Sequence, residues 1–242
     1  MHTGIIYAAG VNKRLSRFIS EPFKGLHQLP SGETLILRQA RHLISLNINR
    51  LVVVIGLEHQ KIADHVTAEL GSVDVRIVLN EEYKNKGNML SLWAARDFCE
   101  TDVTFTTSDL YYEAPLPKMF GSALRSTVIV ETNINKAVDF DDAVKVKVDN
   151  GSVSRIHKRL NLHQTDGVCP GFYHYKAKDI KKVLTDINEQ LMLGNVNQSL
   201  YRSLDRVALD VKLLPVGCGR SFWLDVDTAE DLESLRCHFN GK

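Results

Sequence analysis

A loop of small and basic residues directly follows the first apolar segment. Residues 5–8 are apolar and lead into Ala8-Ala9-Gly10-Val11-Asn12-Lys13-Arg14-Leu15. Small residues let a backbone approach a ligand closely, successive N–H groups cradle phosphate oxygens, and an arginine adds a bidentate contact. Neither GxxxxGK[ST] nor GxGxxG is present, so a plain surface turn is the alternative. The candidate phosphate-binding residues are Ala8, Ala9, Gly10, Val11, Asn12, Lys13 and Arg14.

A lysine and an acidic pair add further candidates. Lys24 lies in Pro22-Phe23-Lys24-Gly25-Leu26, and a solvated surface charge is its ordinary interpretation. Asp225 and Asp227 lie in Phe222-Trp223-Leu224-Asp225-Val226-Asp227, where strand alternation would put both carboxylates on one side. The alternative is a contact with the N-terminal dipole of the following helix. Ser108 and Asp109 follow a strand predicted over residues 103–107, a position typical of caps and turns.

These residues need a scaffold, and the first half of the chain alternates strand and helix patterns. Strands are predicted at residues 5–8, 51–56, 73–79 and 103–107, with helices at 35–44, 62–70 and 89–98. This order indicates right-handed βαβ units and a mainly parallel sheet, which binds ligands beyond the carboxyl ends of its strands. The first loop follows such a strand end.

The second half has a different pattern. Residues 143–148 and 153–156 flank Asp149-Asn150-Gly151, and Asn-Gly between alternating runs predicts a hairpin. Further strands are expected at 168–175 and 211–216, with helices at 180–191 and 228–239, the latter capped by Thr228 and Asp231. We expect one domain over 1–242, with a nucleotide-binding half over about 1–112 and an acceptor-binding half over about 113–242.

Composition excludes several classes of protein. The 242 residues carry 30 Lys+Arg and 29 Asp+Glu, a net charge of +1, and 44% are hydrophobic. A balanced chain has no general hold on nucleic acid or anionic membranes, so neither is expected as a partner. No apolar run is long enough to span a membrane, and MHTGIIYAAG does not read as a signal peptide. Four cysteines without CxxC spacing predict reduced thiols in the cytoplasm.

The run IIYAAG-VNKRL followed by PFKGL resembles the start of the nucleotidyltransferases of the glycosyltransferase-A-like superfamily. Their pattern is AAG-x-G-[ST]-R-[LM] and then P-K-x-L, from which Asn12, Lys13 and Phe23 depart. The segment N-x-x-Y-x-x-x-G-N-M-x-S-L over residues 80–92 resembles the cytidylyltransferases for phosphocholine, inositol-1-phosphate and 2-aminoethylphosphonate. TTSDLYY resembles the phosphonate branch, and WLDVDT the inositol-phosphate branch. The resemblance runs from residue 4 to about residue 236.

This resemblance implies a Rossmann-like twisted sheet flanked by helices, with a small β-hairpin lobe over the acceptor site. It implies base and ribose contacts at Gly87, Asn88 and Ser91, although a helix-capping loop also explains that segment. It places Ser108 beside the nucleotide and identifies Asp109, Asp225 and Asp227 as Mg²⁺ ligands, because Mg²⁺ prefers hard carboxylate oxygens. Arg14 and Lys24 become the catalytic cations. The acceptor-binding residues expected from it and from the aromatic pattern are Tyr111, Lys158, Gly171 and Trp223.

The expected reaction is Mg²⁺-dependent transfer of CMP from CTP to a small phosphorylated or phosphonate alcohol or amine, with release of pyrophosphate. Sugar-1-phosphate nucleotidyl transfer is an alternative. Asp225-Val226-Asp227 also reads as the DxD of a glycosyltransferase, but its C-terminal position and the paired Arg14 and Lys24 upstream argue against that class. A non-catalytic nucleotide-binding regulatory module stays open because of the departures in the first loop. The sequence leaves a homodimer open as well.

Overall fold

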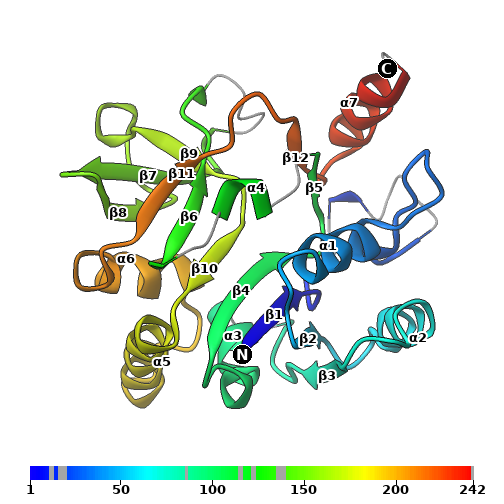
Figure 1. The fold of residues 1–242 in the computed structure, drawn as a ribbon, viewed down its shortest axis with the longest axis horizontal. Helices are drawn as coiled ribbons and strands as arrows, with labels where there is room; N and C mark the ends of the chain where they lie inside the picture. Colours follow the sequence, from blue (N-terminus) through cyan, green and yellow to red (C-terminus); the bar gives the residue numbers. More distant parts are fainter. Residues whose placement is uncertain are drawn as a thin grey trace.

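The computed structural model describes residues 1–10, 14–15, 21–84, 87–113, 117–120, 124–134 and 140–240. Its centre is a seven-stranded sheet in the order β11-β6-β10-β4-β1-β2-β3 (Figure 1). Within it, only β10 runs antiparallel to its neighbours. The strands are β1 (His2–Tyr7), β2 (Arg50–Ile55), β3 (Val75–Leu79), β4 (Asp102–Thr107), β6 (Thr127–Val130), β10 (Tyr173–Tyr175) and β11 (Leu214–Gly217).

Helices cover both faces of this sheet because its central strands are apolar on both faces. Ile5 of β1 packs into the core shared with α3 (Met89–Ala94), α5 (Ala177–Met192) and α6 (Leu200–Val211). The next residue, Ile6, packs into the core under α1 (Leu35–Ile44) and α2 (Gln60–Glu69). Both isoleucines are fully buried. The mainly parallel, helix-flanked sheet predicted from the sequence is confirmed.

Two smaller antiparallel sheets complete the fold. The strands β7 (Val144–Asp149), β8 (Ser152–His157) and β9 (Gly167–Cys169) form one of them, which lies at the upper left of Figure 1. Asn150 and Gly151 have φ values of 51° and 73°, the signature of a type I′ turn, so the predicted hairpin is confirmed. The other sheet pairs β5 (Leu110–Tyr112) with β12 (Trp223–Asp225).

The last helix, α7 (Ala229–Asn240), begins where the sequence predicts. Asp231 N–H donates to Thr228 Oγ1 at 3.2 Å, and Thr228 N–H donates to Asp231 Oδ2 at 2.7 Å, which is a reciprocal helix cap. Short helical segments are α4 (Pro117–Phe120) and the 3₁₀ turns η2 (Lys24–Leu26), η3 (Arg96–Phe98) and η5 (Leu162–Gln164).

Two predicted elements are wrong in detail. Residues 168–175 form two strands instead of one, because the chain turns at Pro170-Gly171, where Gly171 has a φ of 106°. Residues 211–216 were predicted as one strand, but Val211 ends α6 and the left-handed Lys212 (φ 52°) separates it from β11. The sequence analysis missed α6 itself, whose apolar face lies in the core.

Candidate active site

A first cavity of about 270 Å³ lies at the carboxyl ends of β1, β3 and β4. It is lined by the backbone after β1, by Asn80 after β3 and by Ser108 after β4. Parallel strands present their carboxyl ends at one edge of a sheet, so three segments that are remote in sequence converge here. The predicted nucleotide-binding residues Ala8 and Ala9 line this cavity, and so do Gly10, Gly87, Asn88, Ser91 and Ser108.

The loop after β1 is held by backbone hydrogen bonds. Ala8 N–H donates to the Val54 carbonyl at 2.8 Å, and Ser108 N–H donates to the Tyr7 carbonyl at 3.0 Å. Ala8 and Ala9 are buried, and their small side chains leave room for a ligand at the backbone. The predicted phosphate-binding residues Val11, Asn12 and Lys13 lie outside the described part of the chain.

Gly87 and Asn88 attach a distant segment to the first cavity. A Cβ on Gly87 would lie 1.9 Å from the carbonyl oxygen of Gln198, so only glycine permits this approach. Asn88 Oδ1 accepts a hydrogen bond from Leu200 N–H at 2.9 Å, which fixes the start of α6. Asn80 Nδ2 donates to Ser91 Oγ at 3.1 Å. The side chain of Asn88 thus positions α6, while the residue still lines the cavity.

A second cavity of about 350 Å³ adjoins the first. The residues that line both are Lys24, Thr107, Asp109, Gly171 and Tyr201. The second cavity is strongly charged: cations enter it from Arg14, Lys24 and Lys158, and carboxylates enter from Asp109, Asp142, Asp225, Asp227 and Asp231. A ligand in each cavity would therefore meet the other at Lys24 and Asp109.

Lys24 connects the acidic residues at this junction. Its ammonium forms an ion pair with Asp227 and lies 3.3 Å from Asp109 Oδ2. Arg14 also pairs with Asp227 and lies 3.6 Å from Asp142 Oδ2. Between 17% and 24% of the Lys24, Asp109 and Asp227 side chains is exposed, so water screens these charges only in part.

The β5–β12 pairing brings Asp225 beside Asp109. Asp225 is opposite Leu110 in that pair, and Val226 N–H donates to the Asp109 carbonyl at 3.0 Å. Asp225 is exposed to solvent and lines the second cavity. Desolvation by the protein atoms packed around this carboxylate, together with the charge of Asp109, raises the pKa of Asp225 to about 7.

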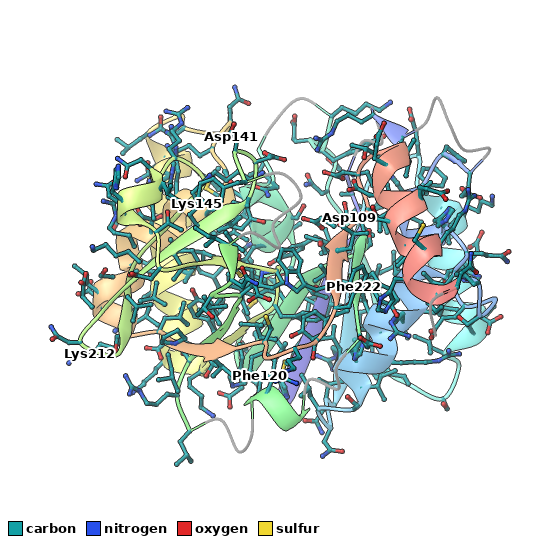
Figure 2. The ribbon with its side chains drawn as sticks, turned by 90° about the horizontal axis from the view of Figure 1, so that it is seen from above. Asp109, Phe120, Asp141, Lys145, Lys212 and Phe222 are labelled. Carbon is teal, nitrogen blue, oxygen red and sulfur yellow. The ribbon has the colours of Figure 1, made fainter. Side chains whose placement is uncertain are left out.

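Lys158 and Asp142 form another part of the second cavity, and their side chains are 2.7 Å apart. Burial alone would raise the pKa of Asp142, but the hydrogen bond from Lys158 and the nearby charges of Lys158 and Arg14 hold it below its ordinary value. The buried Lys145 of β7 donates from Nζ to the carbonyls of Asp141 (3.0 Å), Ala143 (3.3 Å) and Lys158 (2.7 Å). Figure 2 shows Lys145 and Asp141 to the left of Asp109.

Three of the four acceptor-binding residues predicted from the sequence line the second cavity, and one does not. Lys158, Gly171 and Trp223 line the second cavity, together with the catalytic candidates Arg14 and Lys24. Tyr111 does not reach either cavity. It is 1% exposed, lies in the cluster with Phe222 and Phe239, and carries the Arg38 guanidinium 4.6 Å from its ring centroid. Its assignment to the acceptor site is therefore wrong, because its side chain points into the core under α7.

The carboxylates fit Mg²⁺ when the substrate supplies the remaining ligands. Among the described residues, no three histidine, cysteine or acidic side chains converge closely enough to enclose a metal ion. Mg²⁺ in phosphate-transfer sites, however, uses one or two carboxylates plus phosphates and water. Asp109 and Asp225 repel each other and Asp109 lies 3.3 Å from Lys24, whereas Asp227 is paired with both Lys24 and Arg14. Asp109 and Asp225 are thus the better-placed ligands.

Several lining residues were missed by the sequence analysis. Tyr201 enters both cavities from the unpredicted helix α6. Phe23, His59 and Tyr83 line the first cavity as a contiguous aromatic group, with ring centroids 4.7 Å (Phe23–His59) and 5.0 Å (His59–Tyr83) apart. Nothing in the spacing of these aromatic residues distinguishes them from core residues, and only the fold brings them together.

Comparisons with known proteins agree with this arrangement. The MobA-like NTP transferase domain matches residues 4–128. The bifunctional IPC transferase and DIPP synthase of Thermococcus kodakarensis is 28% identical over 232 residues, covering 96% of this chain and 49% of the relative. The protein of the same name from Aquifex aeolicus is 24% identical over 237 residues, covering 98% and 51%. The chain thus spans about half the length of the curated relatives it matches.

Among solved structures, the inositol-1-phosphate CTP transferase from T. maritima superimposes with a TM-score of 0.81 at 20% identity, covering 98% of this chain and 94% of that one. This likeness shows that the two share the glycosyltransferase-A-like nucleotidyltransferase fold. The chain belongs to the family of MobA-like NTP transferase domains. No helix in the described ranges is long and apolar enough to cross a membrane.

Proposed function

We propose that this chain is a cytidylyltransferase that transfers CMP from CTP to the phosphate or phosphonate group of a small alcohol or amine. The observation that carries the proposal is the place of Lys24, which lines both cavities where they meet. A reaction between two anionic substrates needs a cation at the point where they join. The first cavity would hold the nucleotide and the second the acceptor.

In this reaction an oxygen of the acceptor attacks the α-phosphorus, the bond to the β-phosphate oxygen breaks, and pyrophosphate leaves. The attacking oxygen is already an anion, so no general base is needed. The barrier comes from bringing anions together and from the charge that develops at the α-phosphate. Positioning and preorganised positive charge are then the main sources of rate. Lys24 would contact both the α-phosphate and the attacking group, and Arg14 with the Ala8–Gly10 amides would bind the outer phosphates.

A divalent cation fits the proposal. Asp109 and Asp225 would hold Mg²⁺, and Asp227 would orient Lys24 and Arg14. When bound, Mg²⁺ neutralises triphosphate charge and orients the leaving group. Asp231 accepts the backbone N–H of Asp227 at 2.9 Å, so the cap of α7 also fixes the acidic segment.

The acceptor is proposed from the second cavity. Lys158 would bind the acceptor phosphate, while Asp142, Trp223 and Tyr201 would contact the rest of the molecule. Support for CTP and for a phosphorylated polyol comes from the T. maritima protein, named as an inositol-1-phosphate CTP transferase. An amine-bearing acceptor is supported by the excess of carboxylates over cations in this cavity, because carboxylates favour a positive group.

The test is a pyrophosphate-release screen. Four NTPs are each combined with phosphocholine, 2-aminoethylphosphonate, inositol phosphate, glycerol phosphate and hexose-1-phosphates. We expect turnover with CTP and one of the non-sugar acceptors. Turnover only with a hexose-1-phosphate would contradict the proposed acceptor class. Calorimetric CTP binding without turnover across the whole panel would favour a regulatory module instead.

The metal assignment has its own test. Asp225→Asn should move the Mg²⁺ concentration for half-maximal activity upward about tenfold or more, because one hard ligand and its charge are lost. The matched control is Asp64→Asn on α2, where the exposed carboxylate accepts a hydrogen bond from Gln60. A metal titration curve identical in both variants would remove Asp225 from the metal site.

A further inference from the structure

A third cavity, of about 310 Å³, is rich in arginine and shares no lining residue with the other two. It lies between the end of β8 and one face of α6. Its charged and polar lining consists mainly of Arg155, His157, Arg159, Arg202, Asp205 and Arg206. Four guanidinium groups and one carboxylate around a single hollow create a local positive field, although the whole chain is nearly neutral.

Two of these arginines are already bound to carboxylates. Arg155 makes a two-pronged contact with Asp205, at 2.9 Å from Nε to Oδ1 and 2.9 Å from Nη2 to Oδ2. Arg206 contacts Asp186 in the same way, at 2.6 Å and 2.8 Å. Asp205 also accepts the backbone N–H of Ile156 at 2.8 Å, so its oxygens are committed to β8.

The other two, Arg159 and Arg202, form no ion pair with any described residue. His157 lines the same cavity, and its Nδ1 accepts the backbone N–H of Arg159 at 2.8 Å. The neutral ring therefore carries its proton on Nε2 and is a further donor. Burial lowers the pKa of His157, and the charges of Arg202, Arg159 and Arg155 act in the same direction against the effect of Asp205. The cavity thus has donors and positive charge in excess of its acceptors.

We propose that this third cavity binds a small phosphate-bearing anion. Two uncommitted guanidinium groups match the oxygens of a phosphate with paired N–H donors, and guanidinium is only weakly hydrated. The paired Arg155–Asp205 unit gives the cavity a fixed wall. An anion there would relieve the repulsion among the arginines and bridge β8 to α6.

The same two segments also reach the second cavity. Lys158 lies between His157 and Arg159 in sequence, and Tyr201 directly precedes Arg202. An anion that fixes Arg159 against Arg202 would thereby restrict Lys158 and Tyr201, and binding at the two cavities would be linked reciprocally. This coupling rests on the proposed function, whereas the anion site itself does not.

The binding test uses inorganic phosphate at constant ionic strength, with thermal unfolding as the readout. We expect the unfolding midpoint of the unmodified protein to rise by roughly 3 °C when phosphate is about tenfold above its Kd. The rise should disappear in the double variant Arg159→Gln/Arg202→Gln. It should persist in Lys24→Ala, which removes a cation from the catalytic cavities. The matched control is Arg76→Gln/Arg96→Gln, which removes two exposed arginines elsewhere.

Three results would overturn the site: no rise in the unmodified protein, a rise lost in Lys24→Ala but kept in the Arg159/Arg202 variant, or an equal loss in the Arg76/Arg96 control. Should the glutamine variant fail to fold, Arg159→Lys/Arg202→Lys keeps the charge and removes the paired donors, so the rise should fall at least by half. An unreduced rise in that folded variant would also overturn the site.

The coupling test measures the acceptor KM with and without phosphate at saturating nucleotide. We expect at least a twofold change in the unmodified protein and none in the Arg159/Arg202 variant. An equal change in both would overturn the coupling. If no acceptor is turned over, the proposed function fails while the thermal experiment still decides the anion site.

Discussion

The first and second cavities are built in different ways. The first combines backbone and small side chains at the ends of β1, β3 and β4 with uncharged aromatic side chains, so much of its shape follows from the sheet. The second uses long charged side chains from segments scattered between Arg14 and Asp231. We therefore expect strand geometry to set the shape of the first cavity, on the nucleotide side. The second cavity, on the acceptor side, depends on ion pairs that substitutions can change without altering the fold.

The strongest test of this comparison removes the residue that both cavities share. Lys24→Ala should lower kcat/KM by about a thousandfold, because it deletes a preorganised cation from a partly desolvated site. Pyrophosphate release measures the loss, and circular dichroism should show an unchanged fold. Turnover near that of the unmodified protein would place the reaction away from the junction.

A second variant addresses the acceptor side alone. Lys158→Met should raise the acceptor KM by about 10–100-fold, as expected for a charge-assisted contact worth roughly 1.5–3 kcal/mol. The KM for CTP should stay within about twofold. Steady-state kinetics with each substrate varied in turn make the measurement. Equal effects on both KM values would mean that the two cavities do not act separately.

A substitution of Lys145 tests the acceptor side indirectly, because the Lys145 ammonium binds the carbonyls of both Asp141 and Lys158. It is expected to act through Lys158 and not through contact with the acceptor. Lys145→Met should therefore add little to the acceptor KM of Lys158→Met when the two are combined. Full additivity in that double-mutant cycle would separate the two residues.

In the first cavity, on the nucleotide side, we expect steric crowding of the backbone to matter more than the loss of a charge. Gly87→Ala forces a Cβ toward the Gln198 carbonyl, so we expect about 1–3 kcal/mol of lost stability and a higher KM for CTP. Gly217→Ala is the matched control, because a Cβ there meets nothing within 4 Å. Chemical denaturation and CTP kinetics compare the two. Equal behaviour would mean that the contact to α6 does not shape the first cavity.

The last expected effect lies outside both cavities. Burial, assisted by the nearby His2, lowers the pKa of His174 to about 4, and its Nδ1 shares a hydrogen bond of 2.9 Å with Thr104 Oγ1. Between the unfolded pKa of 6.5 and about 4, the unfolded chain binds more protons, so stability falls as the pH falls. The titration of His174 should therefore lower the free energy of unfolding by about 2 kcal/mol between pH 7 and pH 5.

Urea unfolding at these two pH values measures this loss. His174→Asn keeps an acceptor for Thr104 but does not titrate, so its stability should depend less on pH. An unchanged pH dependence in that variant would mean that other groups cause the loss.

Sequence reasoning succeeded where local structure depends on residues that are neighbours along the chain. The helix at 35–44, the hairpin around Asn150 and the cap formed by Thr228 were predicted because each depends on neighbouring residues. Ser91, Lys24 and Trp223 line the cavities, and their roles in binding and catalysis stay predictions. Tyr111 was assigned wrongly because an aromatic residue after an acidic strand end has the same pattern in a site and in a core.

The sequence by itself determined the alternating strands and helices, the family and the residues that follow strand ends, because periodicity and turn chemistry are local properties. Tertiary structure alone decided that Asp225 lies beside Asp109, that α6 brings Tyr201 to both cavities, and that Arg159 and Arg202 line one cavity. Those pairings join residues far apart along the chain, and the physical reason is packing: β5–β12 pairing and burial of the apolar face of α6 set their distances.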